Sequence, residues 1–299
     1  MTFSERIDAW ERLTRLDKPI GYLLLLWPTL WGVWLSSLGR PDFWVVVVFV
    51  LGTVLMRSAG CIMNDIADRK FDPLVERTKD RPIAAGLVSV PEALALAAVL
   101  ALCAFALAWQ FHRLVVWLAL PALFLAITYP YMKRFFVLPQ AYLGVAFGFG
   151  IPMAYAANTG GVSWLAWYLL LANVFWTLAY DTEYAMVDRN DDVRLGIRTS
   201  AILFGRRDVA FVMAFHAIFL AMMTGFGLYV RLGRWYFAGI AVAAVLAALQ
   251  YRAIRDRTRE GCFRAFRANN WIGIAILAGI IVDFSVRRGW PPIRLPALG

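Results

Sequence analysis

Residues 135–180 contain no Asp, Glu, Lys or Arg, and this long uncharged stretch constrains the chain more than any other feature. A bilayer crossing needs about 20 apolar residues, so the stretch is long enough for two transmembrane helices. Helices on the outside of a soluble protein need a polar face, which this stretch lacks. The whole chain agrees, because 61% of its 299 residues are hydrophobic and only 17% are charged. The sequence therefore excludes a soluble fold and predicts an all-α integral membrane protein.

The apolar runs of the chain are each long enough to cross, or nearly cross, the membrane as a helix. We expect about nine transmembrane helices that form a bundle, in a single domain over residues 1–299. The last apolar run is short, because the charged residue Asp283 interrupts it, so a total of eight helices is the alternative. The runs begin near Pro19, Phe43, Ala93, Leu114, Val137, Ser163, Val209, Trp235 and Asn270.

The N-terminal segment, residues 1–18, mixes Trp10 and Leu13 with several arginines. This pattern is typical of an amphipathic helix that lies on the membrane surface. Glu5, Asp8 and Glu11 argue against a cleavable signal peptide. The three cysteines are far apart in the sequence, so neither a disulfide framework nor a CxxC metal site is indicated.

The basic residues predict the orientation of the chain in its membrane. The net charge of +10 does not require a nucleic-acid partner, because the Lys and Arg residues lie in short segments between apolar runs. With a cytoplasmic N-terminus, 22 of the 30 Lys and Arg residues fall in cytoplasmic segments, seven fall on the opposite side, and Arg57 lies inside the second helix. The connections 64–88, 185–207 and 252–267 would then all face the cytoplasm.

Half of the 20 acidic residues fall in two short windows, five in Asp65–Asp80 and five in Asp181–Asp192. The windows follow the second and the sixth predicted helix. Asp68 and Asp188 are 120 residues apart, since 188 minus 68 is 120. This spacing is consistent with two pseudo-repeats, each built on a four-helix unit, whose acidic windows face each other.

Within each window the acidic residues are spaced for one helical stripe. In the first, Asn64, Asp68 and Asp72 are four residues apart and precede the helix-ending Pro73. In the second, Asp188 and Asp192 repeat the spacing of four, and Asp181 precedes them by seven. Like charges at this spacing destabilise a helix, so a cation is expected to offset them. Mg²⁺ is the natural candidate, because it binds one or two carboxylates together with substrate phosphates.

The alternative interpretation is that these carboxylates pair with Arg69, Arg189 and Arg194 as solvated surface charges. Other basic residues on the same face are suited to bind phosphate oxygens. Arg57 is separate, because an arginine inside a membrane helix needs an anion. Its partner is either a protein carboxylate such as Asp181 or the carboxylate of a substrate. The other basic residues of this face are Arg77, Lys79, Arg81, Lys133, Arg134 and Arg198.

Two apolar features have structural interpretations. Trp27, Trp31 and Trp34 in the first predicted helix indicate anchoring at the membrane interface. The glycines of the stretch 144–150 indicate close packing of helices. Both features are also compatible with the wall of a tunnel for a lipid chain.

Two segments around the acidic windows read as motifs: NDIADRKFD, with RSAGC before it, and YDTEYAMVDRNDDVRLGIRTSAILFG. They resemble the two signature motifs of the UbiA superfamily of membrane prenyltransferases. The resemblance extends over nearly the whole chain through LDKPIGYLLLLWPTLWG and TYPYMKRF. Glu183 stands where the family usually has Gln, and Arg198 where it usually has Lys. Both departures leave the spacing of the aspartates intact.

The resemblance implies a helical bundle around a central cavity, with Mg²⁺ and a polyprenyl diphosphate at its cytoplasmic mouth. Asp68 and Asp72 would hold one metal ion together with Asn64, and Asp188 would hold the other together with Asp192. These four aspartates are the implied catalytic residues. Substrate binding is implied for Arg57 and Asn64 at the acceptor, and for Tyr129, Lys133 and Arg198 at the diphosphate.

The reaction that the resemblance implies is transfer of the polyprenyl group to 4-hydroxybenzoate, at the ring carbon ortho to the hydroxyl, as in ubiquinone biosynthesis. The expected location is a bacterial inner membrane, with membrane lipid but no nucleic acid as a partner. Another aromatic acceptor, such as a naphthoate or homogentisate, is the alternative within the family. A cation transporter is the alternative from another class. The position of the acids at one membrane end argues against it, because transporter sites lie near the midplane.

Overall fold

The protein is described by a computed structural model that covers residues 2–75 and 77–286, apart from the side chain of Lys133. These residues form helices and no strand. The elements are α1 (Phe3–Thr14), α2 (Ile20–Ser36), α3 (Phe43–Asp68), η1 (Asp72–Leu74), α4 (Val90–Ala108), α5 (Arg113–Phe135), α6 (Pro139–Gly148), α7 (Gly150–Thr159), α8 (Trp164–Leu195), α9 (Ser200–Phe204), η2 (Gly205–Arg207), α10 (Asp208–Tyr229), α11 (Arg234–Ile254) and α12 (Arg259–Val286).

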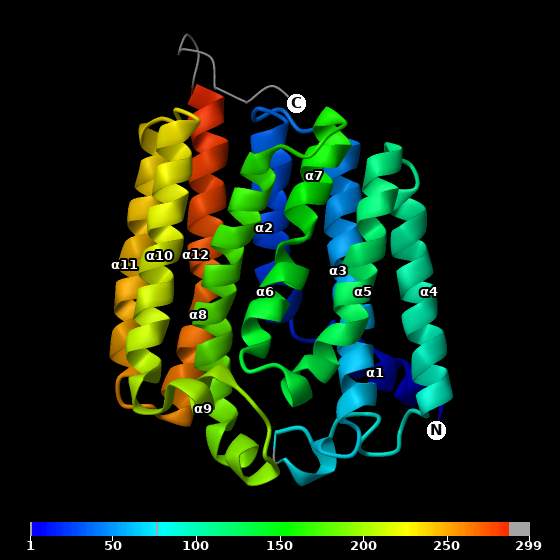
Figure 1. Cartoon of the computed structure of the whole chain (residues 1–299). Helices are drawn as coiled ribbons and strands as arrows, with labels where there is room; N and C mark the ends of the chain where they lie inside the picture. The colour runs from blue at the N-terminus through cyan, green and yellow to red at the C-terminus, as the bar shows by residue number, and fades with distance from the viewer. Residues whose placement is uncertain (1, 76, 287–299) are drawn as a thin grey trace.

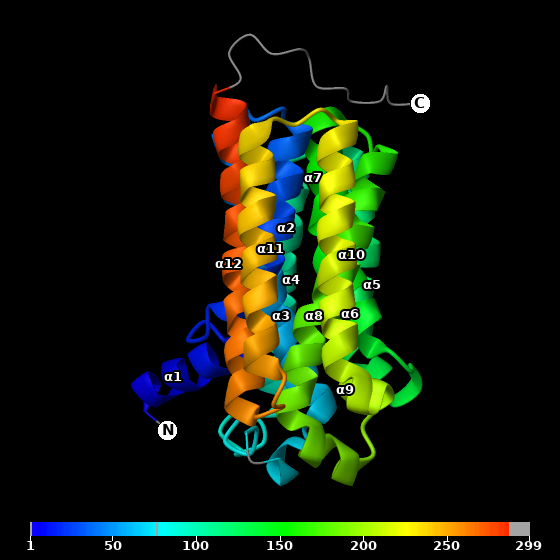
Figure 2. The same ribbon diagram turned by 90° about the vertical axis from the view of Figure 1, so that its left-hand side faces the viewer.

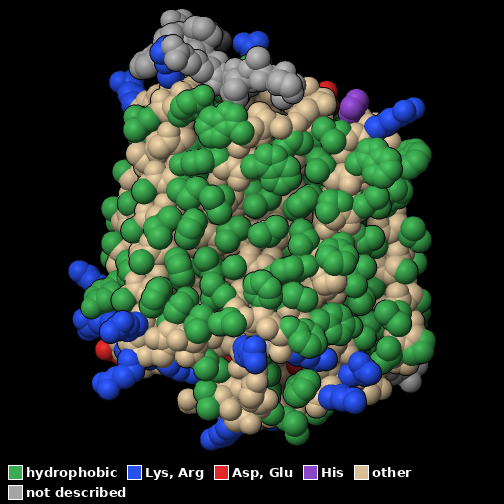
Figure 3. All heavy atoms as spheres, viewed as in Figure 1, with side chains coloured by type: hydrophobic (Ala, Val, Ile, Leu, Met, Phe, Trp, Pro, Cys, Tyr) green, Lys and Arg blue, Asp and Glu red, His purple; other side chains and the backbone are tan. Residues whose placement is uncertain are grey.

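The long helices run side by side along one axis, and α1 lies across the base of the bundle (Figures 1 and 2). The segment after α3 and the end of α8 extend beyond the bundle at the same end as α1. We call this end the basic end, because most of the visible Lys and Arg side chains lie there, below a broad apolar band, and fewer lie at the opposite end (Figure 3). An apolar band bounded by charge is the surface expected of a protein in a bilayer.

The all-α membrane architecture predicted from the sequence is confirmed. Within the described part of the chain, six helices are long and apolar enough to cross a membrane, and α2 is a shorter apolar helix. The total of nine spans stays a prediction, as does the internal duplication. The last helix is longer than predicted, because α12 begins at Arg259 rather than near Asn270. The predicted loop 252–267 therefore shrinks to a short turn between Ile254 and Arg259.

The glycines of the stretch 144–150 allow close helix packing, as predicted. The chain breaks its helix at Phe149, between α6 and α7, and Gly150 follows immediately. A Cβ at Gly150 would lie 2.2 Å from Oγ1 of Thr29 in α2. A Cβ at Gly144 would lie 2.8 Å from Cα of Val174 in α8. Only glycine permits these approaches, which bring α6 and α7 against α8 and α2.

An aromatic cluster holds α2, α8 and α10 together. Trp31 and Trp176 have ring centroids 5.3 Å apart, and Phe219 stacks on Trp176 at 5.6 Å. All three side chains are buried. The interpretation of Trp31 as an interfacial anchor is therefore wrong, because its ring faces α8 rather than the membrane surface. Trp176 Nε1 also donates to Asn269 Oδ1 of α12 at 3.0 Å, which adds the last helix to the cluster.

Helix α1 packs part of its surface against the bundle, and its predicted role as an amphipathic helix on the membrane surface stays a prediction. Ala9 and Leu13 are buried against α3 and α4, whereas Phe3, at the start of the helix, is 79% exposed. Thr2 and Glu5 form a capping box at its N-terminus. An exposed phenylalanine on a surface helix beside an apolar band is suited to insert among lipids.

Candidate functional site

The first acidic window begins on α3 but does not continue along it. Helix α3 ends at Asp68, and Asp72 lies beyond a turn, at the start of the 3₁₀ helix η1. The prediction that Asn64, Asp68 and Asp72 share one helical stripe is therefore wrong for Asp72. Pro73 disfavours helical backbone at the residue before it, which is consistent with this early end. Asn64 and Asp68 do share one face, and Asn64 Nδ2 donates to Asp68 Oδ2 at 3.2 Å.

Asp72 is buried and held by Arg81. Arg81 Nη1 lies 3.0 Å from Asp72 Oδ2 and 3.0 Å from Asp65 Oδ1, so one guanidinium binds two buried carboxylates. Burial raises the pKa of Asp72, the positive charge of Arg81 opposes this shift, and the nearby carboxylates of Asp65 and Asp68 raise it further. A carboxyl in this position is poised to gain from a second cation.

Asp65 connects this acidic cluster to the N-terminal helix. Arg15, which follows α1, donates from Nη2 to both carboxylate oxygens of Asp65 at 2.8 and 2.9 Å. Asp65 is 1% exposed, so its two arginine partners offset the cost of burying its charge. Neither Arg15 nor Asp65 was predicted as part of the site. Their only signal in the sequence was that Asp65 belongs to the first acidic window.

The second acidic window lies on one continuous helix, as predicted. Helix α8 runs through Asp181, Asp188 and Asp192 before it ends at Leu195. Arg77, in the segment after η1, donates from Nε to Asp188 Oδ1 at 3.0 Å and also binds Oδ2 from Nη2. The two acidic windows are therefore in direct contact, which places the predicted halves of the site together.

Arginines from distant segments pair with the acids, and they differ from the predicted ones. Asp188 binds Arg77, and Arg259 of α12 binds Asp191 at 2.7 Å. Arg189 instead pairs with Asp208 at 2.7 Å. Arg69 donates to a backbone carbonyl of α3. The alternative interpretation, that the carboxylates pair with arginines, thus holds for several acids. The arginines that form the pairs are not the predicted ones, because residues close in sequence need not be in contact in the bundle.

The donor set fits a divalent cation that is bound together with phosphate. Among the described residues, no group of three or more His, Cys, Asp or Glu side chains is arranged to hold a metal ion by itself. The donors near each other are carboxylate and amide oxygens, as in Asp68 and Asn64. Mg²⁺ prefers such oxygens and commonly binds only one or two protein carboxylates, with phosphates and waters as its other ligands. The residues therefore suit a metal diphosphate better than a bare metal ion.

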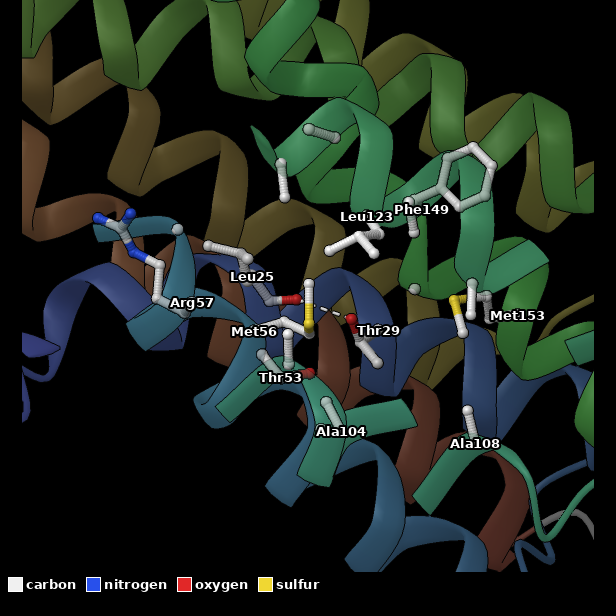
Figure 4. A pocket seen from close by; sticks show the side chains of 18 of the residues that line it. Leu25, Thr29, Thr53, Met56, Arg57, Ala104, Ala108, Leu123, Phe149 and Met153 are labelled. Atoms are coloured by element: carbon white, nitrogen blue, oxygen red, sulfur yellow. Dashed lines mark hydrogen bonds between the residues drawn. The ribbon is translucent and has the colours of Figure 1, made fainter. Parts of the chain in front are cut away.

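An apolar cavity with an empty volume of about 1370 Å³ opens beside these acids. Its walls come from α2 to α7, and they include Phe49, Phe105 and Phe111 far from the acids. Arg57 and Asn64 line the same cavity. Figure 4 shows Arg57 at one end of this wall and Ala108 and Met153 at the other.

Arg57 is the charged residue of this cavity. Within the described part of the chain, its buried Nε has no hydrogen-bond partner. The group lies over the Phe147 ring at 5.5 Å. Gly21 leaves room for it, because a Cβ there would lie 3.0 Å from Nη2. Of the two alternatives for its partner, a protein carboxylate or a substrate carboxylate, the unpartnered Nε in a cavity wall favours the substrate.

Three further residues were predicted to bind the diphosphate: Tyr129, Lys133 and Arg198. Tyr129 of α5 lines the cavity together with Arg57. The side chain of Lys133 lies outside the described part of the structure. Arg198 is exposed and donates to the backbone carbonyl of Phe135 at 3.3 Å. The structure thus brings Tyr129 to the cavity but gives Arg198 a contact with the end of α5.

Comparison with known proteins gives near full-length matches. A protein from Dechloromonas aromatica, named 4-hydroxybenzoate octaprenyltransferase, is 61% identical over 94% of this chain and 96% of its own length. A protein of the same name from Nitrosomonas europaea is 58% identical over 95% of this chain and 97% of its own length.

Solved structures share the fold. A UbiA homologue from Aeropyrum pernix has a TM-score of 0.77 and 29% identity, and the match covers 88% of this chain and 97% of that one. A UbiA homologue from Archaeoglobus fulgidus, bound to GPP and Mg²⁺, has a TM-score of 0.70 at 17% identity, over 93% of this chain and 100% of that one. The sequence itself matches the UbiA prenyltransferase family over residues 25–273. The chain therefore belongs to the UbiA prenyltransferase family.

Proposed function

We propose that this chain transfers a polyprenyl group from a polyprenyl diphosphate to 4-hydroxybenzoate. The product is 3-polyprenyl-4-hydroxybenzoate, as in ubiquinone biosynthesis. The single observation that carries the proposal is the guanidinium of Arg57, which lies in an apolar cavity beside two acidic windows and has a buried Nε without a hydrogen-bond partner. The names of the relatives support it, because proteins 58–61% identical over nearly the whole chain are called 4-hydroxybenzoate octaprenyltransferases.

Arg57 would bind the carboxylate of the acceptor. A guanidinium matches a planar carboxylate with two parallel hydrogen bonds, and these are stronger when both groups are charged. A guanidinium with an unpartnered nitrogen in a membrane-embedded cavity is costly unless a ligand binds it. Bound in this way, the acceptor ring would extend past Asn64 toward the acids, since Arg57 and Asn64 are two helical turns apart on α3.

The donor diphosphate would bind at the acids with Mg²⁺. Asp68 and Asp72 with Asn64 would hold one metal ion, and Asp188 with Asp192 would hold the other. The two ions would neutralise the leaving diphosphate and so promote breakage of its C–O bond. Arg77 and Arg81 already bind Asp188 and Asp72. Both guanidinium groups would bind diphosphate oxygens as well. Tyr129, Lys133 and Arg198 are proposed for the same role, as the family resemblance implies.

The chemistry follows from charge and from the exclusion of water. Departure of diphosphate leaves an allylic cation, and the electron-rich carbon ortho to the hydroxyl attacks it to form the new C–C bond. The ring then loses a proton, so the products are the prenylated acid, diphosphate and one proton. Water would trap the cation as an alcohol, and an apolar cavity within the bundle limits its access.

The cavity suits the prenyl chain as well. Asn64 and Phe49 both line it, and they are 15 positions apart on α3, or about 22 Å of helix. The apolar tail would lie along this wall, away from the acids. The relatives are named octaprenyltransferases, so the octaprenyl diphosphate is the donor to test first.

We place the site on the cytoplasmic side of a bacterial inner membrane. The basic end carries α1, the segment after α3 and the end of α8, and the positive-inside rule assigns such an end to the cytoplasm. A polyprenyl donor dissolved in the bilayer would then meet a water-soluble acceptor at this face.

The test uses membranes that contain the protein, incubated with Mg²⁺, 4-hydroxybenzoate and prenyl diphosphates of several chain lengths. Mass spectrometry is expected to find the 3-polyprenyl product, and chelation of Mg²⁺ is expected to abolish it. A homogentisate or naphthoate supplied in place of 4-hydroxybenzoate should give no product. Efficient prenylation of either would replace the proposed acceptor, and no prenylation of any acceptor would reject the enzyme.

A further inference from the structure

A second hollow of the molecule lies outside the cavity, on the surface between the start of α2 and the first turns of α12. It is an open groove with an empty volume of about 1150 Å³. Its apolar walls include Ile20 and Leu23 of α2 and Phe263 and Trp271 of α12. Arg264 and Arg267 lie in the same groove. The site proposed above makes no use of this feature.

The two arginines of the groove differ from their neighbours in lacking acidic partners. Within the described residues, neither Arg264 nor Arg267 has an ion pair or a hydrogen bond, although Glu260 lines the same groove one turn before Arg264. Two other arginines near the start of α12 are paired, Arg257 with Asp208 at 2.8 Å and Arg259 with Asp191 at 2.7 Å. The groove therefore presents positive charge beside apolar side chains.

The groove lies where headgroups of a bilayer are expected. Helix α12 starts at the basic end and runs along the bundle toward the opposite end (Figure 2). Trp271 is 60% exposed, one turn beyond Arg267. Tryptophan is favoured at the depth where headgroups meet acyl chains. Along α12 the groove thus changes from charged to apolar, as a phospholipid does along its length.

A wall separates the groove from the bundle interior. Trp27 Nε1 donates to Asn270 Oδ1 at 2.9 Å, which joins α2 to α12. Gly273 lets the two helices approach, since a Cβ there would lie 2.3 Å from Cδ1 of Trp27. The groove uses Ile20 and Leu23 of α2, whereas the cavity uses Leu25 and Thr29 of the same helix. A molecule in the groove is therefore not on the path to the acids.

We propose that this groove binds an anionic phospholipid. Its phosphate would bind between Arg264 and Arg267, and one acyl chain would lie along Leu23 and Trp271. Basic pockets between helices on the cytoplasmic side are suited to acidic headgroups, whose charge a zwitterionic lipid does not offer. The proposal does not depend on the prenyl transfer reaction.

The experiment compares lipid retention by the purified full-length chain. The protein is incubated with mixed micelles of phosphatidylglycerol and phosphatidylcholine, and native mass spectrometry counts the lipids that stay bound. We expect the wild type to retain phosphatidylglycerol in preference. Arg264→Ala and Arg267→Ala should each lower the ratio of retained phosphatidylglycerol to phosphatidylcholine by about fivefold. The matched control is Arg252→Ala, an exposed arginine at the end of α11 that does not line the groove.

Two further variants keep the proposal testable if an alanine variant misfolds. Arg264→Lys combined with Arg267→Lys retains both charges and should keep the preference. Ala268→Phe fills the groove and should lower retention of both lipids. Unchanged retention in Ala268→Phe, or an equal loss in the Arg252→Ala control, would overturn the proposal. Displacement of phosphatidylglycerol by octaprenyl diphosphate in the wild type would overturn it too, because the groove would then be a donor site.

Discussion

Arg77 binds both carboxylate oxygens of Asp188, although the two residues lie 111 positions apart in the chain. The Arg77 guanidinium also lies 4.9 Å from the centre of the Tyr184 ring, one turn before Asp188 on α8. This contact joins the segment after α3 to the second acidic window. It also means that Arg77 and the proposed metal would share one carboxylate, so loading of the site is expected to rearrange this ion pair.

Replacement of Arg77 by alanine is expected to weaken binding of the donor. The variant loses a guanidinium placed to bind diphosphate oxygens, and a charged hydrogen bond is worth roughly 1.5–3 kcal/mol, so the KM for polyprenyl diphosphate should rise at least about tenfold. The KM for 4-hydroxybenzoate should change little. Steady-state kinetics with each substrate varied in turn measures both values. Arg252→Ala is the control, and an equal rise of both KM values in Arg77→Ala would contradict the assignment.

Replacement of Asp68 or Asp192 by asparagine is expected to stop turnover and leave the protein folded. Each change removes one negative charge from the proposed metal site, and loss of a charge-stabilising group commonly lowers turnover by on the order of a hundredfold or more. Initial rates and thermal unfolding are measured on the same preparations. Asp80→Asn is the control, because Asp80 belongs to the first acidic window but is exposed and not a predicted ligand. Near-normal rates in both site variants would reject the metal assignment.

Much of the fold was predictable because it follows from local composition. Apolar runs and basic connections determine the helices and their order. The aspartates of the second acidic window lie on α8 as predicted, because a spacing of four and seven residues is a local property of a helix. The prediction for the first acidic window was wrong at Asp72, which does not continue the helix. Its carboxylate binds Arg81 from a 3₁₀ turn, and this contact cannot be predicted from residue spacing.

The parts of the site that were missed depend on contacts between distant segments. Arg15 and Asp65 are 50 residues apart, and their ion pair exists only because α1 packs across the base of α3. Trp31 was misassigned for a related reason. A tryptophan in a membrane helix is compatible with either the interface or the core, and only the stacking partners on α8 and α10 decide between them.

Replacement of Arg15 by alanine is expected to loosen the first acidic segment. Asp65 would keep Arg81 alone, so Arg81 would bind Asp72 less well and the segment 69–88 should exchange its amide hydrogens faster. Hydrogen exchange followed by mass spectrometry measures this directly, without substrate. Arg6→Ala is the control on the same helix, since Arg6 is half-exposed and 3.7 Å from Glu92. If both variants exchange at the wild-type rate, α1 does not position the site.

The predicted orientation can be tested with single cysteines in a background that lacks Cys61, Cys103 and Cys262. Lys70 and Arg40 are exposed at opposite ends of the bundle, at the two ends of α3. An impermeant thiol reagent added from the periplasmic side should label Arg40→Cys and spare Lys70→Cys. Disruption of the membrane should allow labelling of both, which checks that each thiol is accessible. Labelling of Lys70→Cys alone in intact cells would reverse the topology.

The Arg57→Lys variant tests the acceptor site. A lysine keeps the charge but not the two parallel hydrogen bonds, so the KM for 4-hydroxybenzoate should rise by about ten- to a hundredfold if KM reflects binding. The KM for the polyprenyl diphosphate should stay close to the wild-type value. Steady-state kinetics with each substrate varied separately gives both numbers.

The same interaction can be removed from the side of the acceptor. Wild-type protein should use 4-hydroxybenzaldehyde poorly, because it lacks the carboxylate, and Arg57→Lys should lower its use little further. This non-additivity is the sign that guanidinium and carboxylate contact each other. Asp181→Asn provides the control for the rival ion pair and should not reproduce the effect of Arg57→Lys on the acceptor KM. Additive losses, or a fall in expression without a change in KM, would show that Arg57 has a structural role and does not bind the acceptor.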